Sequence, residues 1–221
     1  MSDFAAVSVI LIVRNGEDYI GAALESVVQG EYRPSEILVI DGDSTDRTCD
    51  IARTFPLVRV VHQQTRGITD AYNEGIAAAR SDTVAFISHD DLWEPDKLAL
   101  QMLDLRKHPQ AQYCVCMVQH FLNPGDEIPE GFRPELLQTP VTGMIMEALV
   151  ARKSVFEQVG SFNADFSVSS DTEWFARARD AGVPMNVVPK TLVRKRVHGS
   201  NNSIHFKNLN ELWLRAVRDS V

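Results

Sequence analysis

Residues 83–95 read Thr-Val-Ala-Phe-Ile-Ser-His-Asp-Asp-Leu-Trp-Glu-Pro, and this stretch indicates both the fold and the position of a site. Residues 84–87 are typical of a short buried strand rich in β-branched and aromatic side chains. Asp90 and Asp91 come directly after that strand, at its carboxyl end. Open α/β sheets bind their ligands at the carboxyl ends of the strands. We therefore expect Asp90 and Asp91 to face a ligand.

Two adjacent carboxylates repel one another at neutral pH unless a cation lies beside them. The cation that suits oxygen ligands and substrate phosphates is hard and divalent, Mg²⁺ or Mn²⁺. On these residues alone a structural alternative stays open, in which Asp91 caps the helix that is entered near Pro95. The surrounding sequence favours the metal interpretation.

Strands and helices alternate through the first hundred residues. The run Val-Ser-Val-Ile-Leu-Ile-Val at 7–13 is typical of a parallel strand that is buried on both faces. Further strands are expected at 37–40 and 58–61, with helices at 17–29, 45–54 and 69–80. This alternation indicates an α/β fold of successive right-handed βαβ units, with a mostly parallel central sheet flanked by helices.

Polar, Asp-rich clusters follow the first, second and fourth of these strands. In a parallel sheet the carboxyl ends of such strands meet at one edge, so the clusters should open on the same side. The residues expected around one crevice are Asn15, Asp41, Asp43, Asp90 and Asp91.

Composition and charge are those of an ordinary globular protein. The chain has 221 residues, 44% hydrophobic and 24% charged, which suits a single domain over residues 1–221. The formal net charge is −8. An acidic chain is not suited to hold a polyphosphate backbone, so we expect no binding to nucleic acid. A small phosphate ligand held through a metal is compatible with that charge.

The cysteines and the N-terminus indicate a cytoplasmic protein. Cys49, Cys114 and Cys116 are an odd number with one C-x-C pair, which fits neither a usual zinc site nor a secreted disulfide scaffold. The first residues, Met-Ser-Asp-Phe, lack the basic segment of a signal peptide. No apolar run approaches the roughly 20 residues that span a bilayer. The sequence predicts reduced thiols and no transmembrane segment.

The second half of the chain is less regular. Helices are expected at 98–108, 153–159 and 171–181, and strands at 113–119 and 187–188. Residues 123–142 hold four prolines and two glycines, which is typical of a long loop. Residues 194–203 are basic and polar. Residues 209–217 predict a last amphipathic helix that packs within the protein or in a homodimer.

Six short blocks carry the strongest signal in the chain. They are Val7-Ser-Val-Ile-Leu-Ile-Val-Arg-Asn-Gly16, Ile37-Leu-Val-Ile-Asp-Gly-Asp-Ser-Thr-Asp46, Ile68-Thr-Asp-Ala-Tyr-Asn-Glu-Gly75, Ser88-His-Asp-Asp91, Ser169-Ser-Asp-Thr-Glu-Trp174 and Arg196-Val-His-Gly-Ser-Asn201. In this order they resemble the motifs of the inverting family 2 glycosyltransferases, which have the GT-A fold, a Rossmann-like domain. The resemblance covers nearly the whole chain. It implies that residues 1–100 bind a nucleotide-sugar, that residues 101–221 form the acceptor side, and that transfer inverts the anomeric carbon.

The resemblance also implies a metal, Mn²⁺ or Mg²⁺, on the diphosphate of a donor that is most often a UDP-sugar. Asp90 and Asp91 resemble the family's D-x-D element, in which Asp91 is the candidate for direct metal contact and Asp90 for contact with the nucleotide-sugar. Ser88 stands where many relatives carry a further Asp. His198 is similar to a late family residue that reaches the metal or diphosphate. The basic residues 194–196 beside it suit a loop that closes over phosphates.

Asp171 falls where the family places its catalytic base, at the start of a helix. A carboxylate there would take the proton of the acceptor as the acceptor oxygen attacks C1 of the sugar. Many relatives have Glu-Asp at this point, whereas this chain has Ser170-Asp171. The alternative without the family is that Asp171 or Ser170 caps the helix.

A last group of residues resembles the family's nucleotide-binding corner. Asp41 and Asp43 correspond to its base- and ribose-binding acids, and Arg14 stands where relatives often have Tyr. The complete set of candidate nucleotide-binding residues is Val13, Arg14, Asn15, Asp41, Asp43, Arg66, Asp70 and Asp90.

Three functions are compatible with these residues. The leading hypothesis is a metal-dependent inverting glycosyltransferase that acts on a glycan, a lipid-linked sugar, a peptide or a small molecule. A sugar-1-phosphate nucleotidyltransferase would want a Gly-rich basic loop after the first strand, which Val13-Arg-Asn-Gly16 does not supply. A non-catalytic binding module of the same fold is favoured by Ser88 and Ser170 and opposed by Asp91 and Asp171.

Overall fold

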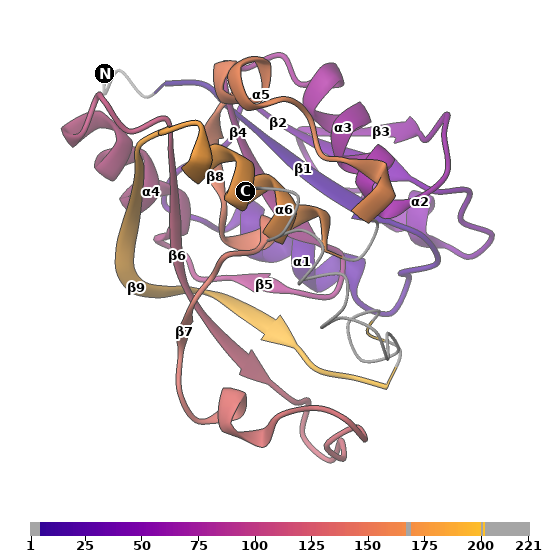
Figure 1. The fold of residues 1–221 in the computed structure, drawn as a ribbon. Helices are drawn as coiled ribbons and strands as arrows, with labels where there is room; N and C mark the ends of the chain where they lie inside the picture. The colour runs from indigo at the N-terminus through magenta and orange to yellow at the C-terminus, as the bar shows by residue number, and fades with distance from the viewer. Residues whose placement is uncertain (1–4, 167–168, 200, 202–221) are drawn as a thin grey trace.

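A computed structural model describes residues 5–166, 169–199 and 201 of the chain (Figure 1). The strands are β1 Val7–Val13, β2 Glu36–Asp41, β3 Val58–His62, β4 Thr83–Ser88, β5 Leu92–Trp93, β6 Tyr113–Phe121, β7 Val141–Thr142, β8 Val150–Arg152 and β9 Met185–Arg196. The α-helices are α1 Ile20–Val28, α2 Thr48–Arg53, α3 Ile68–Ala78, α4 Lys97–Lys107, α5 Ser154–Val159 and α6 Ser170–Asp180. Three short 3₁₀ helices are η1 Pro134–Leu137, η2 Met146–Ala148 and η3 Ala164–Phe166.

One mixed sheet runs through the described part of the chain. Its strand order is β3-β2-β1-β4-β8-β6-β9-β5, with β7 paired to β6. The pairs among β1, β2, β3 and β4 are all parallel, which confirms the parallel sheet predicted from the βα alternation. β8 is antiparallel to β4 and β6, and β9 runs parallel to β6. The sheet is thus mostly parallel and has helices packed around it (Figure 1).

The register brings the ends of the first strands to one edge. Val13 lies opposite Asp41, and Ile12 lies opposite Ser88. The loops that follow β1, β2 and β4 therefore start side by side, as the sequence predicted. β1 and β2 are buried along their whole length, as is typical of parallel strands inside an α/β domain.

The core is closely packed where α3 lies on β1 and β2. A Cβ atom built on Gly75 of α3 would lie 2.5 Å from Cγ2 of Ile10 and 3.3 Å from Cγ1 of Ile40. Glycine at this position lets the helix backbone approach the sheet. Since α3 follows directly on the loop that carries Arg66, this approach also sets the position of that loop.

The second half differs from the sequence prediction in two elements. A strand was expected only at 187–188, but β9 is 12 residues long and ends at Arg196. Residues 194–196, expected in a loop, therefore lie in the sheet. The loop expected at 123–142 contains η1 and β7, and it projects from the body of the domain at the bottom of Figure 1. The predicted helix at 209–217 lies outside the described residues.

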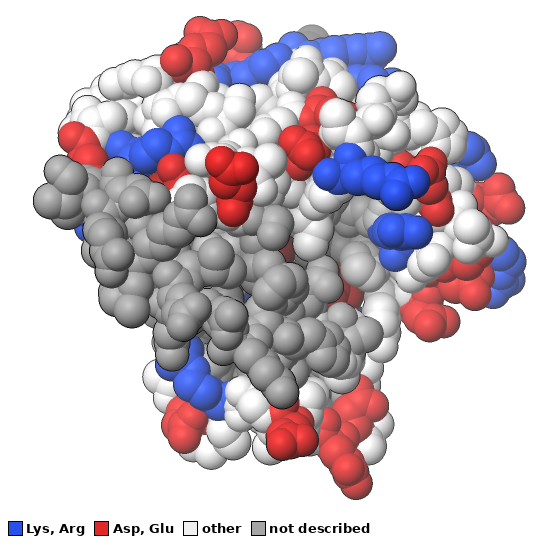
Figure 2. Space-filling model, turned by 45° about the vertical axis from the view of Figure 1, so that its right-hand side comes forward, with Lys and Arg blue, Asp and Glu red and all other residues white. Residues whose placement is uncertain are grey.

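The surface shows no feature that would attract a polyanion on the face drawn in Figure 2. Over the described residues of that face, Lys and Arg alternate with Asp and Glu, and no broad basic area forms. This distribution agrees with the net charge of −8. Within the described ranges, none of the helices is both long enough and apolar enough for a membrane span.

We predict that Gly75→Ala lowers the free energy of unfolding by about 1–3 kcal/mol, because the new methyl group overlaps Ile10 and overpacks the core. Urea unfolding of both proteins measures the difference. Gly21→Ala in α1 is the matched control, since its new Cβ would lie 3.7 Å from Ile51. The control should leave stability unchanged or raise it by up to about 1 kcal/mol. Equal midpoints for wild type and Gly75→Ala would contradict the packing argument.

Candidate active site

The loops after β1 and β2 are joined by hydrogen bonds into one corner. The N–H of Asn15 donates to Oγ of Ser44 at 2.8 Å, and Oδ1 of Asn15 accepts from the N–H of Thr45 at 2.8 Å. The N–H of Gly16 donates to Oγ1 of Thr48 at 2.8 Å. Asn15 has a φ of 51°, a left-handed conformation that Asn adopts more readily than most residues. The loops after β1 and β2 therefore order one another through these hydrogen bonds.

Asp41 and Asp43 have different surroundings in this corner. Asp41 is 1% exposed, accepts from the N–H of Ser44 at 3.3 Å, and lies 3.5 Å from Nδ1 of His62. Asp43 is exposed on the turn and has a φ of 62°. Asp41 thus orders the loop, and Asp43 is free to contact solvent or a ligand.

The other predicted nucleotide-binding residues flank the corner. The carbonyl oxygen of Val13 accepts from the N–H of Gly42 at 2.9 Å, and the exposed Arg14 follows it. Arg66 is exposed in the loop between β3 and α3, and Asp70 lies in the first turn of α3. Among the described residues, no hydrogen bond or ion pair joins Arg66 or Asp70 to the corner around Asn15.

The loop that carries Arg66 is nevertheless held in place. The carboxylate of Glu74 accepts from the N–H of Gln64 at 2.9 Å, from the N–H of Thr65 at 2.9 Å and from Oγ1 of Thr65 at 2.6 Å. The side chain of Gln63 donates to the carbonyl oxygen of Gly67 at 2.7 Å. Arg66 therefore extends from a loop whose backbone is ordered.

Asp90 and His198 meet across a separation of 108 residues. Nε2 of His198 lies 3.0 Å from Oδ2 of Asp90, and Nδ2 of Asn201 donates to the same oxygen at 3.2 Å. The ring of Tyr19 stacks on the imidazole with centroids 5.2 Å apart. Burial alone would raise the pKa of Asp90, but the hydrogen bond with His198 and the charges of His89 and Lys195 outweigh it and lower that pKa. Asp90 is therefore an anion beside an imidazole nitrogen.

Asp91 faces the interior instead. It is fully buried, Oδ2 accepts from Nζ of Lys195 at 3.0 Å, and Oδ1 accepts from the N–H of Arg196 at 2.9 Å. Burial raises the pKa of the Asp91 carboxyl, and the Lys195 ammonium opposes that rise. Both oxygens of the predicted metal ligand are thus engaged by β9.

The basic residues at the end of β9 do not form the phosphate-closing loop that the sequence suggested. Nε of Arg196 donates to the carbonyl oxygen of Asp90 at 2.8 Å, and its guanidinium lies 4.6 Å from the ring centroid of Phe121 and 4.9 Å from that of Tyr19. The guanidinium of the exposed Arg194 packs on the same Phe121 ring, 4.6 Å from its centroid. Lys195 and Arg196 therefore hold the Asp90–Asp91 turn against β9, because strand pairing directs them toward it.

Glu147 completes a buried group of charges. It lies in η2, is 7% exposed, and its Oε1 is 3.3 Å from Nζ of Lys195. Burial alone would lower the pKa of Lys195, but Asp91, Glu147 and Asp90 outweigh it and hold that pKa well above its ordinary value. Lys195 is therefore a permanent cation between two carboxylates.

Asp171 lies in the first turn of α6 and is partly buried. Its Oδ1 accepts from the N–H of Thr172 at 2.7 Å. Within the described residues no donor reaches Oδ2. Burial raises the pKa of Asp171 to about 6, and the N–H of Thr172 opposes the rise. The helix itself begins at Ser170 after Ser169, whose side chain makes no capping hydrogen bond, so Asp171 is not the N-cap.

The donor atoms of Asp90 and His198 fit a divalent metal. A carboxylate oxygen and an imidazole nitrogen converge within 3.0 Å, and both are ligands that Mn²⁺ accepts. Over residues 5–166, 169–199 and 201, no three His, Cys, Asp or Glu side chains form a complete metal cluster. Two protein ligands are enough when substrate phosphates and water complete the coordination, as is usual for Mg²⁺.

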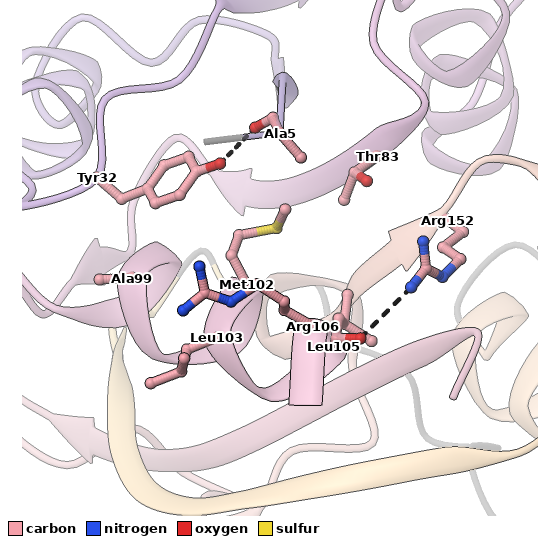
Figure 3. Close-up of a pocket in the computed structure, with 9 residues that line it drawn as sticks. All are labelled: Ala5, Tyr32, Thr83, Ala99, Met102, Leu103, Leu105, Arg106 and Arg152. Atoms are coloured by element: carbon pink, nitrogen blue, oxygen red, sulfur yellow. Dashed lines mark hydrogen bonds between the residues drawn. The ribbon is translucent and has the colours of Figure 1, made fainter. Parts of the chain in front are cut away.

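A pocket of about 220 Å³ lies elsewhere in the domain (Figure 3). It is lined mainly by α4 and also by Tyr32, Arg152 and Thr83, the first residue of β4. The Asp90–Asp91 turn follows the last residue of β4. The pocket therefore opens at the opposite end of that strand and takes no part in the site.

Sequence reasoning located the strand ends but missed Glu147 and the contacts of Lys195. Glu147 is the only acid in the apolar run 144–151, and an isolated acid in a buried segment is a signal for a charged partner. Lys195 was recognised only as part of a basic segment. Its partner could not be read from the sequence, because Asp91 lies 104 residues away.

Comparison with known proteins identifies the family and the fold. A family model described as Glycosyl transferase family 2 matches residues 8–162. An uncharacterized glycosyltransferase of Rickettsia felis is 26% identical over 226 residues, which cover 94% of this chain and 37% of that protein. Crystal structures of S. aureus TarS residues 1–349 with UDP-GlcNAc and with UDP superpose with TM-scores of 0.75 and 0.72, each at 17% identity over 97% of this chain and 65% of that one.

The likeness to TarS concerns the fold, and it confirms the GT-A architecture expected from the sequence motifs. The chain spans little more than a third of the Rickettsia felis relative. The family match covers most of the chain and includes Asn15, Asp41, Asp90 and Asp91. This chain belongs to glycosyl transferase family 2.

Proposed function

We propose that this protein transfers a sugar from a UDP-sugar to an acceptor hydroxyl, with inversion at the anomeric carbon. The observation that carries the proposal is the pairing of Asp90 with His198 at the carboxyl edge of a parallel sheet. TarS, which shares the fold, has been crystallised with UDP and with UDP-GlcNAc, and this supports a donor of the same class. UDP-GlcNAc is therefore the donor to test first.

The nucleoside would occupy the corner between Asn15 and Asp41, where backbone and side-chain groups are already ordered by Ser44 and Thr45. Arg14, directly before Asn15, and Arg66, in the loop between β3 and α3, are exposed cations that could contact the nucleotide. The diphosphate would then extend along the sheet edge toward Asp90. Preformed loops lower the entropy lost on binding.

We assign the metal to Asp90 and His198 rather than to Asp91. Both oxygens of Asp91 already accept hydrogen bonds from Lys195 and Arg196, so metal binding there would break a buried ion pair. A bound divalent cation would neutralise charge on the diphosphate leaving group. Arg196 positions Asp90 by donating to its carbonyl oxygen, and Tyr19 positions His198 by stacking on the imidazole ring. Both metal ligands would thus be held in place.

Asp171 is proposed as the general base. Its Oδ1 is held by Thr172, and Oδ2 has no donor among the described residues, which leaves that oxygen to accept the proton of an acceptor hydroxyl. A pKa of about 6, raised by burial, makes the carboxylate a better proton acceptor than an exposed Asp while keeping it ionised at neutral pH. Attack on C1 and departure of the nucleoside diphosphate then occur on opposite sides of the sugar.

We expect Asp90→Asn and Asp91→Asn to fail in different ways. UDP with MnCl₂ at 100 times its dissociation constant should raise the melting temperature of wild type by roughly 5–10 °C. Asp90→Asn should lose the Mn²⁺-dependent part of this rise, and its ligand-free stability should also fall, because the lowered pKa of Asp90 means that its charge stabilises the folded protein. Asp91→Asn should lower the ligand-free free energy of unfolding by about 1–3 kcal/mol, because Lys195 loses a charged hydrogen bond. A Mn²⁺ response abolished only by Asp91→Asn would overturn the assignment.

Asp171→Asn should reduce kcat for transfer by about 10²–10⁴, because it removes the base. The same variant should keep the melting shift with UDP and Mn²⁺, and its own melting temperature should not fall, since burial disfavours the charged carboxylate. UDP release from UDP-GlcNAc over a panel of acceptors measures the rate. Full activity of Asp171→Asn would remove it from the mechanism, and nucleotide binding without turnover in wild type would favour a binding module.

The pH dependence follows from the protonation of Asp171. The base acts only as the carboxylate, so kcat/KM should fall as the pH drops through about 6, and about tenfold per pH unit below that. Initial rates between pH 4.5 and 8 in buffers of constant ionic strength test this expectation. If the residual activity of Asp171→Asn still falls as the pH drops through about 6, the titration belongs to another group.

A further inference from the structure

A short segment, residues 159–162, connects the end of α5 to η3, ahead of the helix that carries Asp171. Gly160, which follows the last residue of α5, has a φ of 91°. This left-handed conformation suits glycine and turns the chain out of the helix. From this turn on, the backbone groups of the segment form hydrogen bonds with other elements of the fold.

Two side chains of α6 hold the segment from one side. Nε1 of Trp174 donates to the carbonyl oxygen of Gly160 at 3.0 Å, and Nη2 of Arg177 donates to that of Ser161 at 2.8 Å. Trp174 is fully buried, so its indole N–H requires a partner of this kind. Asp171, three residues before Trp174, is therefore on a helix that is fixed to the segment.

One side chain of α3 holds the segment from the other side. Oδ1 of Asn73 accepts from the N–H of Phe162 at 3.0 Å, and Nδ2 of Asn73 donates to the carbonyl oxygen of Phe162 at 2.9 Å. The side-chain amide thus pairs with both backbone groups of a residue 89 positions away. A carboxylate offers no donor for this pairing and an alkyl side chain offers neither group. Asn73 is therefore a clamp between α3 and the segment.

The ring of Phe162 continues this link into the core. Phe162 is 3% exposed, and its ring centroid lies 5.6 Å from that of Trp174 on α6. The same ring lies 6.1 Å from that of Tyr72 on α3 and 6.4 Å from that of Phe86 on β4. β4 leads directly into the turn that holds Asp90. Movement of Phe162 would therefore change how α6 packs against α3 and β4.

We propose that Asn73 is a positioning residue, which acts through the backbone of Phe162 to set where Asp171 lies relative to the donor. The inference rests on the proposed role of Asp171 as the base. α3 and β4 belong to the half of the chain that would hold the donor, whereas α6 carries the base. A misplacement of about 1 Å between reacting groups can lower a rate by about 10²-fold. The clamp thus serves kcat, and donor binding does not depend on it.

The test separates kcat from donor binding in Asn73→Ala. UDP release from UDP-GlcNAc, with the acceptor that supports the highest wild-type rate, gives kcat and the donor KM. We expect kcat to fall by roughly 10–100-fold, because the base loses its fixed position. The donor KM and the melting shift with UDP and MnCl₂ should keep their wild-type values. Hydrogen exchange measured by NMR should show that the Phe162 amide exchanges about tenfold faster or more, which reports the open clamp.

A double-mutant cycle shows whether Asn73 acts through Asp171. Residues that act as a unit are not additive, so Asn73→Ala should change the residual rate of Asp171→Asn by less than about twofold. A loss from Asn73→Ala that is as large in the Asp171→Asn protein as in wild type would show that Asn73 affects the rate by another route. That result would overturn the inference.

Arg59→Met is the matched control for stability. Nη2 of Arg59 donates to the carbonyl oxygen of Ala78, the last residue of α3, at 2.9 Å, and this bond does not involve residues 159–162. Both variants should lower the melting temperature by about 2–8 °C, because each leaves a backbone group without its partner. Only Asn73→Ala should lower kcat. If Asn73→Ala does not fold, Asn73→Asp keeps the acceptor for the Phe162 N–H, removes the donor and should lower kcat at an unchanged donor KM.

The outcomes distinguish this inference from the proposed function. A wild-type kcat in Asn73→Ala, with fast exchange at Phe162 and a large loss in Asp171→Asn, would overturn the positioning role and leave the base in place. An equal loss of kcat in Arg59→Met would assign the effect to general destabilisation and overturn the inference as well. A wild-type rate in Asp171→Asn would instead remove the base, and with it the route through which Asn73 acts.

Discussion

The ion pair between Lys195 and Asp91 is the contact on which the site depends. It joins the turn after β4, in the first half of the chain, to the end of β9, in the second half. Because Asp91 is fully buried, loss of the ammonium would leave an uncompensated charge in the interior. The pair therefore keeps the two halves in register. It also holds His198, which lies three residues after Lys195, close to Asp90.

The neighbouring carboxylates of Asp90 and Asp91 have different roles because their surroundings differ. Asp91 receives an ammonium and a backbone N–H, and it serves the fold. Asp90 is contacted at one oxygen by the imidazole of His198 and the amide of Asn201. The same division appears at Asp41 and Asp43, where the buried acid orders a loop and the exposed acid is left for contact. Burial separates Asp41 from Asp43, whereas Asp90 and Asp91 are both buried and differ in their hydrogen-bond partners.

Family membership and the local geometry account for different parts of the mechanism. The fold supplies a sheet edge at which a donor would lie, and this is common to proteins with the GT-A architecture. Glu147 and Lys195 form a buried charge pair in the second half of this chain.

The sequence by itself determined the parallel strands, the edge at which their polar residues gather and the family. Short apolar runs bounded by Asp-rich turns are local patterns, and parallel connections leave few topologies open. Only the tertiary structure decided that β9 extends to Arg196, that Lys195 neutralises Asp91, and that Glu147 joins them. These contacts join residues up to 104 positions apart. No local pattern specifies them, because strand pairing and burial, which bring the charges together, are properties of the whole fold.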